Sequence, residues 1–135
     1  MVRAVAGLAN RGKLFTPHIL KDDKKVLLEQ DLLLDENKLK VISEGMRMAV
    51  TEGTCTALNT GKVEVAAKSG TAQVGLGNTN TNSWIIGFFP YENPRYSFAL
   101  VMERGPKSAS GNATRVMRTV VDYMKDFTPE YFDLN

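Results

Sequence analysis

Lys68-Ser-Gly-Thr-Ala-Gln-Val74 begins a succession of three strand-like runs, continued by Ser83-Trp-Ile-Ile-Gly-Phe-Phe-Pro90 and Tyr96-Ser-Phe-Ala-Leu-Val-Met-Glu103. Residues 63–67 lead into the first run, and the Gly/Asn/Thr-rich loop 75–82 follows it. The turn Tyr91-Glu-Asn-Pro94 separates the second run from the third. This stretch predicts a meander of three antiparallel strands.

Helical periodicity predicts two helices before these strands. Residues 2–10 form the first, and Asn10-Arg-Gly12 ends it with residue types that tolerate a left-handed cap. Its apolar face consists of Val2, Val5, Leu8 and Ala9. The second is expected over residues 37–51, with Asp35 as its N-cap and Gly53 after its end. Its apolar stripe consists of Leu39, Ile42, Met46 and either Ala49 or Val50.

A third helix is predicted after the strands, with Ser110 or Asn112 as its cap. Its apolar residues recur at helical spacing: Val116, Val120, Met124 and Phe127. Met117 and Val121 widen this stripe. So broad an apolar face needs a surface to lie on, and the three-stranded sheet is available. The fold class is therefore α+β, an antiparallel sheet of three main strands packed with helices.

The segment between the first two helices is less regular. Residues 14–20 are expected to be extended, with His18 in a strand, because Pro17 disfavours the helical region for Thr16. The apolar runs 26–28 and 32–34 flank Glu29-Gln-Asp31 and predict a small hairpin with that tripeptide as its turn.

Composition excludes several classes of function. The chain has 135 residues and a net charge of +2 from 17 basic and 15 acidic residues, with no dense basic run, which argues against nucleic-acid binding. One cysteine, Cys55, allows neither an internal disulfide nor a thiolate zinc cluster, and we expect no metal site and no cofactor. No apolar run is long enough to span a bilayer, so we expect any membrane anchor to lie in other sequence.

Lys68-Ser69-Gly70-Thr71 is the candidate site. A lysine flanked by alanines in a strand is costly unless it meets an anion or a polar network. Ser69 and Thr71 are two residues apart, so both hydroxyls project from the same face of the strand. Gly70 leaves this edge open to close backbone approach. Together these residues are suited to hydrogen-bonding an extended acyl chain and receiving its carboxylate.

The whole chain resembles the C-terminal part of the class B penicillin-binding proteins, the monofunctional transpeptidases that cross-link peptidoglycan. Four segments carry the resemblance, in the family's order: Ala4–Leu20, Gly45–Thr54, Ala67–Gln73 and Ser83–Pro90. The resemblance implies that residues 1–135 are the C-terminal portion of a transpeptidase domain with a partial β-lactamase/transpeptidase-like fold.

The resemblance also implies a mechanism. In this superfamily a serine of a Ser-x-x-Lys motif attacks a D-Ala-D-Ala stem peptide, or the β-lactam that mimics it, and an amine resolves the acyl-enzyme. Lys68 corresponds to the lysine of the third motif and orients the serine of the middle motif. Ser69 and Thr71 bind the carboxylate beside Gly70, and the Thr71 N–H is one oxyanion-hole donor. Ser69 replaces the commoner threonine, and Ala67 stands where glycine is frequent.

The catalytic serine itself is missing from these residues. No Ser-x-x-Lys occurs, and Ser110-Gly-Asn112 follows the third motif rather than preceding it, which favours a loop and cap. We therefore expect the isolated chain to be inactive. His18 and Cys55 have no catalytic partners at suitable spacing and are interpreted as structural, and Gly75-Leu-Gly77 lacks the third glycine of a dinucleotide loop.

Three other interpretations remain open. A serine β-lactamase or D,D-carboxypeptidase shares the Lys-Thr-Gly strand, and a non-catalytic β-lactam sensor shares the fold. An unrelated α+β interaction domain is the third. It would be excluded if Lys68, Ser69 and Thr71 lay on one exposed sheet edge facing a cleft.

The resemblance finally implies partners and location. The intact protein would bind stem peptides and β-lactams, work with other cell-wall synthesis proteins, and lie at the extracytoplasmic face of the bacterial cytoplasmic membrane. In the family the last strand pairs with a strand formed before the catalytic serine. Residues 96–103 are therefore expected to have an unpaired apolar edge, and the chain is expected to self-associate by sheet pairing or by exchange of the last helix.

Overall fold

The computed structural model describes residues 1–20, 27–107 and 112–131. Val26 of the predicted hairpin and the predicted cap Ser110 lie outside these ranges. The helices and strands are α1 (Val2–Ala9), β1 (Lys13–Phe15), β2 (Leu28–Asp31), α2 (Glu36–Thr51), β3 (Ala66–Val74), β4 (Asn80–Phe89), β5 (Tyr96–Pro106) and α3 (Asn112–Phe127). Short 3₁₀ turns lie at Thr56–Leu58, Leu76–Asn78 and Pro129–Tyr131.

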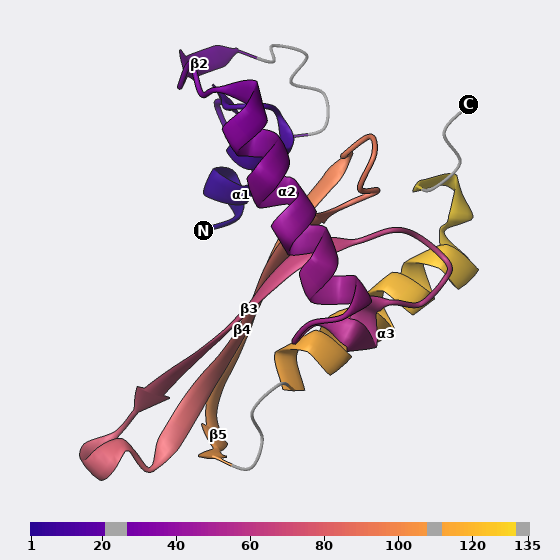
Figure 1. Cartoon of the computed structure of the whole chain (residues 1–135). Helices are drawn as coiled ribbons and strands as arrows, with labels where there is room; N and C mark the ends of the chain where they lie inside the picture. The colour runs from indigo at the N-terminus through magenta and orange to yellow at the C-terminus, as the bar shows by residue number, and fades with distance from the viewer. Residues whose placement is uncertain (21–26, 108–111, 132–135) are drawn as a thin grey trace.

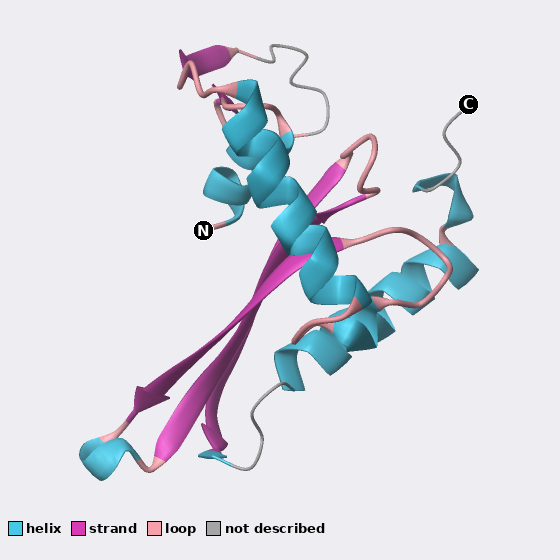
Figure 2. Cartoon of the chain, viewed as in Figure 1, coloured by secondary structure: helices cyan, strands magenta, loops and turns pink. Residues whose placement is uncertain are grey.

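The predicted meander is present as an antiparallel sheet in the order β3-β4-β5 (Figure 2). β4 begins three residues earlier than expected, and β5 continues to Pro106. Packing requires a glycine near the end of β4, since a Cβ on Gly87 would lie 2.3 Å from the carbonyl O of Ala66 and 2.7 Å from Phe98 Cζ. β3 and β5 are the two edges of the sheet.

Apolar clusters cover both faces of this sheet. The larger one joins α2, α3 and the turn at Thr56–Leu58 to one face, and its buried members are Val50, Cys55, Leu58, Val65, Ala67, Ile85, Phe89, Phe98, Ala113, Met117 and Val121. The smaller one joins α1 and α2 to the sheet through Val5, Met46, Ala66 and Phe88. α2 thus contributes to both clusters and crosses the sheet at the start of β3 (Figure 1).

α2 begins and ends as its sequence predicts. The Asp35 side chain accepts a hydrogen bond from the backbone N–H of Lys38, which satisfies one of the free donors at the helix start. Leu39, Met46 and Val50 are buried, but Ile42 is 49% exposed, so its place in the apolar stripe was wrong. α1 also ends as predicted, with Gly12 in the left-handed region.

α3 lies on the sheet, but through a different face from the one predicted. Ala113, Met117 and Val121 are its buried residues, so the residues expected to widen the stripe are in fact its centre. Val116 and Val120 are partly exposed, and Phe127 is 70% exposed. Both stripes are apolar, and the sequence alone could not decide which of them faces the sheet.

The small hairpin predicted over residues 26–34 was wrong. Glu29 to Asp31, expected to be its turn, belong to β2, which pairs antiparallel with β1. The strand expected around His18 is also absent, since regular structure ends at Phe15 and residues 16–20 form neither helix nor strand. The apolar runs indicated a strand in this region, but the strand that pairs with β2 is β1, about fifteen residues earlier in the chain.

Candidate active-site strand

The Lys-Ser-Gly-Thr tetrad lies on the free edge of the sheet. Among the described strands β3 pairs only with β4, which opposes Lys68 to Ile86 and Thr71 to Ser83. Lys68, Gly70 and Thr71 are exposed and Ser69 is half-buried. Ser69 and Thr71 share the face on which Ala67 packs against the larger cluster. The strand therefore presents two hydroxyls, side by side, next to unpaired backbone groups.

Thr54 holds Ser69 from outside the strand. Their hydroxyl oxygens share a hydrogen bond of 2.7 Å, which links the segment after α2 to the middle of β3. The sequence pattern predicts no role for Thr54, although Gly45–Thr54 is one of the four family-like segments. The signal was a Gly-Thr pair directly after a helix, and nothing local showed that its hydroxyl reaches a residue fifteen positions later.

Lys68 turns back onto its own strand. Its Nζ donates a hydrogen bond of 2.6 Å to the carbonyl O of Ser69. Among the residues described, its ammonium forms no ion pair. The ammonium thus lies at the backbone of the tetrad, uncompensated by a carboxylate of the described residues, and its charge favours an anionic ligand there.

Packing within the described structure does not require a glycine at position 70. A Cβ added there would lie 3.5 Å from Trp84 Cβ, an ordinary contact, whereas one at Gly87 would clash. The absence of a side chain at Gly70 therefore leaves room beside the strand that no described residue fills. This suits an extended ligand lying along β3.

Two contacts fix the position of the strand. Arg47 of α2 donates from Nη1 to the carbonyl O of Val65 (3.3 Å) and from Nη2 to Glu64 (3.0 Å), which ties the helix to the start of β3. On the neighbouring strand, Ser83 Oγ accepts a hydrogen bond from the backbone N–H of Ala113 (3.3 Å) in the first turn of α3. Neither contact is predictable from local sequence, because each joins segments that are distant in the chain.

The other residues considered as candidates lie apart from the tetrad. Cys55 is fully buried in the larger cluster. His18 is exposed, and its Nδ1 lies 3.0 Å from the carbonyl O of Leu20. Gly75-Leu-Gly77 forms the tip of the β3–β4 hairpin, where Leu76 is 98% exposed. In the described ranges no three His, Cys, Asp or Glu side chains gather as a metal site would require.

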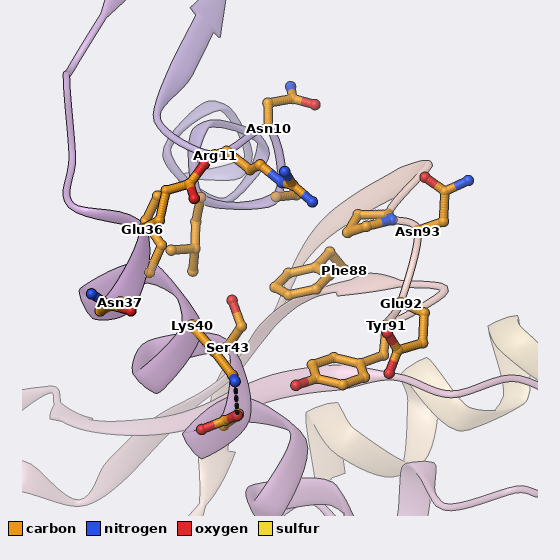
Figure 3. Close-up of a pocket in the computed structure, with 15 residues that line it drawn as sticks. Asn10, Arg11, Glu36, Asn37, Lys40, Ser43, Phe88, Tyr91, Glu92 and Asn93 are labelled. Carbon is orange, nitrogen blue, oxygen red and sulfur yellow. Dashed lines mark ion pairs between the residues drawn. The ribbon is translucent and has the colours of Figure 1, made fainter.

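A cavity of about 770 Å³ lies elsewhere, between α1, α2 and the turn after β4 (Figure 3). Its lining mixes charges, including Arg11, Glu36, Lys40 and Glu92, and none of the tetrad contributes to it. Burial, with the nearby carboxylates of Glu44 and Glu92, raises the pKa of the Tyr91 phenol in its wall. Opposite charges lie close together here, with a Lys40–Glu44 ion pair of 3.8 Å.

Comparison with known proteins assigns the fold. The structure superposes on the D,D-transpeptidase domain of a peptidoglycan glycosyltransferase from Eggerthella lenta with a TM-score of 0.75 at 22% identity, over 95% of this chain and 31% of that one. It superposes on penicillin-binding protein 2 of Helicobacter pylori, solved in complex with MreC, with a TM-score of 0.73 at 26% identity, over 93% of this chain and 24% of that one. These likenesses confirm the α+β class and the transpeptidase-like fold.

Sequence comparison gives the same family. The peptidoglycan D,D-transpeptidase MrdA of Haemophilus influenzae is 32% identical over 148 aligned positions, covering 91% of this chain and 23% of the relative. Penicillin-binding protein H of Bacillus subtilis is 32% identical over 75 positions, half of this chain and 10% of that one. The chain thus spans a quarter or less of these relatives.

The family model of the penicillin-binding protein transpeptidase domain matches residues 1–122. That match excludes the unrelated interaction domain. In the described part of the chain no helix is both long enough and apolar enough to cross a bilayer. The chain belongs to the family of penicillin-binding protein transpeptidase domains, as its resemblance to the class B members predicted.

Proposed function

We propose that this chain provides the Lys-Ser-Gly-Thr wall of a peptidoglycan D,D-transpeptidase active site. One observation carries the proposal: Ser69 and Thr71 share a face of β3, an exposed edge strand among the described strands, and the ammonium of Lys68 binds the backbone carbonyl of Ser69. This strand lies within a segment that the transpeptidase family model matches.

Each residue of the tetrad has a role in the proposal. Lys68 raises the local positive potential and orients a serine contributed by other sequence. Ser69 and Thr71 hydrogen-bond the carboxylate of a stem peptide or β-lactam, and Gly70 lets the ligand backbone approach β3. The Thr71 N–H stabilises the oxyanion that forms when the serine attacks the D-Ala-D-Ala amide. No cofactor takes part.

The remaining catalytic groups come from sequence outside these residues, since the chain contains no Ser-x-x-Lys. We therefore propose that the chain alone is inactive, and that the complete enzyme forms an acyl-serine intermediate at the extracytoplasmic face of the membrane. Its substrates are stem peptides and its partners are other cell-wall synthesis proteins, in line with the Helicobacter relative solved with MreC.

A chimera tests this function. The matching C-terminal segment of the Haemophilus MrdA relative is replaced by residues 1–135, and labelling by a fluorescent penicillin is measured. The chimera should be labelled, the isolated chain should not, and Lys68→Ala should reduce the labelling rate of the chimera by about 100-fold or more, since it removes a charge from the site.

The control is Lys40→Ala, which removes an exposed lysine of α2 that pairs with Glu44 and should leave labelling unchanged. Gel filtration and circular dichroism establish that each chimera is folded. A folded chimera that penicillin does not label, or that labels equally well with Lys68→Ala, contradicts the proposal.

A further inference from the structure

The connection between α2 and β3 contains Thr54, whose hydroxyl bonds Ser69 of the tetrad. Two fully buried side chains, Cys55 and Leu58, anchor the first half of this connection in the larger cluster. The second half, residues 59–64, has no buried side chain. Contacts of another kind must therefore hold it in place.

A charged stripe of α3 provides those contacts (Figure 1). Arg118, Asp122 and Asp126 are four residues apart along α3 and so lie on one face of it. Lys62 Nζ donates to both oxygens of Asp126, at 2.9 and 3.0 Å, and lies 3.6 Å from Asp122 Oδ1. Arg118 donates from Nε to Asp122 (3.1 Å) and from Nη1 to the carbonyl O of Ala57 (3.3 Å). The stripe thus holds the connection once in each half.

Lys62 is the residue on which this attachment depends most. Its ammonium faces two carboxylates at once, and we call these contacts the clasp. The buried Oδ1 of Asp122 has no hydrogen-bond partner in the part of the chain that the structure describes, so it depends on the nearby Lys62 charge. The side chains of this pair are 35% and 29% exposed, and solvent therefore screens them less than a fully exposed pair.

We propose that Lys62 is a positioning residue of the candidate site: its clasp on α3 keeps the connection closed, and the closed connection keeps Thr54 against Ser69. Segments of a folded protein open locally without global unfolding, and the contacts of the segment set how often they do so. Because Thr54 belongs to this connection, opening also releases its hydroxyl from Ser69. The effect on the site rests on the proposed function, whereas the closing of the connection does not.

Cys55 reports the opening directly. It is the only cysteine of the sequence, it is fully buried, and its sulfur lies 3.8 Å from Thr54 Oγ1. A buried thiol reacts only when the structure around it opens, so the rate at which the full chain reacts with dithionitrobenzoate measures opening. Lys62→Glu places a third carboxylate against the two of α3 and should raise this rate by about tenfold or more.

Three variants control the thiol experiment. Lys62→Arg keeps the charge and should leave the rate within about twofold of the wild-type rate. Lys62→Glu combined with Asp126→Lys restores an opposite pair and should recover most of the protection. Lys40→Glu alters an exposed pair on α2 and should change nothing. An unchanged rate in Lys62→Glu, or a double variant that reacts as fast as Lys62→Glu, overturns the proposal.

Low concentrations of urea separate local opening from global unfolding. Local opening exposes little surface, so its rate should depend only weakly on urea, whereas global unfolding depends on urea strongly. If the Cys55 reaction in Lys62→Glu rises with urea as steeply as global unfolding does, the clasp stabilises only the whole fold and the proposal is wrong.

The penicillin-labelling chimera tests the effect on the site. Lys62→Glu should slow acylation by no more than Thr54→Val does, and the two substitutions together should slow it no further than Thr54→Val alone, because both act through one hydrogen bond. Additive effects would show that Lys62 does not act through Thr54. The experiments can fail separately: an unlabelled chimera contradicts the proposed function, and the reactivity of Cys55 in the full chain still decides whether the clasp closes the connection.

Discussion

At the scale of single residues, Thr54 is the feature that ties the candidate site to the fold. Its hydroxyl shares a 2.7 Å hydrogen bond with Ser69, and it follows α2, which Arg47 holds against the start of β3. Ser69 therefore has a preferred orientation before any ligand binds. Pre-organisation of this kind lowers the cost of binding a carboxylate.

Replacing Thr54 by Val should slow penicillin labelling of the chimera by at most about tenfold and lower the free energy of unfolding by only about 1 kcal/mol, since one neutral hydrogen bond is lost. Thr54→Ser keeps the hydroxyl and serves as the matched control. Acylation kinetics and urea unfolding check both expectations. Equal acylation rates for Thr54→Val and Thr54→Ser would show that the Thr54 hydroxyl does not contribute to the site.

Two glycines of neighbouring strands make a second test. Gly87→Ala forces a methyl group against the Ala66 carbonyl and the Phe98 ring, so it should lower the free energy of unfolding by about 3 kcal/mol or more. Gly70→Ala meets only Trp84 at 3.5 Å and should change that free energy by less than about 1 kcal/mol, while slowing acylation in the chimera. Equal destabilisation by both substitutions in urea would contradict this account.

At the scale of elements, α2 positions β3 through one half-buried arginine, Arg47. The Arg47 side chain is only 18% exposed and reaches both Glu64 and the carbonyl O of Val65. Arg47→Ala should therefore lower the free energy of unfolding by about 1–3 kcal/mol. Lys40→Ala, which breaks an exposed pair on the same helix, should cost less than about 0.5 kcal/mol. Denaturant unfolding of the two variants measures the difference.

Elements whose signals are local were predictable from the sequence. α2 has an N-cap carboxylate and an apolar stripe, and the meander has turn residues between short runs, so both were found within a few residues of their bounds. The pairing of β2 with β1 and the buried face of α3 were not found. β2 depends on a partner distant in the sequence, and α3 carries two apolar stripes that differ only in what they meet.

The candidate site was likewise predictable only in part: the arrangement along β3 was, and the contacts from α2 and the segment after it were not. Alternation along one strand places Ser69 and Thr71 together, and this follows from the sequence alone. Thr54 and Arg47 reach the strand from another element, and their contacts depend on how α2 crosses the sheet. The contacts of Thr54 and Arg47 with β3 could therefore be identified only from the structure.

At the scale of the whole molecule, two side chains have a raised pKa in the native state, Lys62 and Tyr91. Lys62 donates to Asp126 and also lies near Asp122, both on α3, and the hydrogen bond to Asp126 raises its pKa above 10.5. Tyr91 packs against the smaller apolar cluster, and burial raises the pKa of its phenol. Both therefore retain protons in the native state that the unfolded chain releases.

Above about pH 10 the native state consequently holds more protons than the unfolded state, so the free energy of unfolding falls as pH rises. The double variant Lys62→Gln with Tyr91→Phe should show a flatter alkaline decline than the wild type, although it is less stable at neutral pH. Urea unfolding between pH 8 and pH 11 measures the two slopes. Parallel slopes would show that other groups control the decline.

The β3–β4 hairpin extends well beyond the helices, and the residues at its tip, Leu76–Asn78, are exposed (Figure 1). A protease that cuts only there leaves two peptides which nine residue pairs of the β3–β4 ladder still hold together. One peptide carries α2 and Lys68, and the other carries β4, β5 and α3. The hairpin tip is thus a natural split point, at which separately made halves should reassemble into the native sheet.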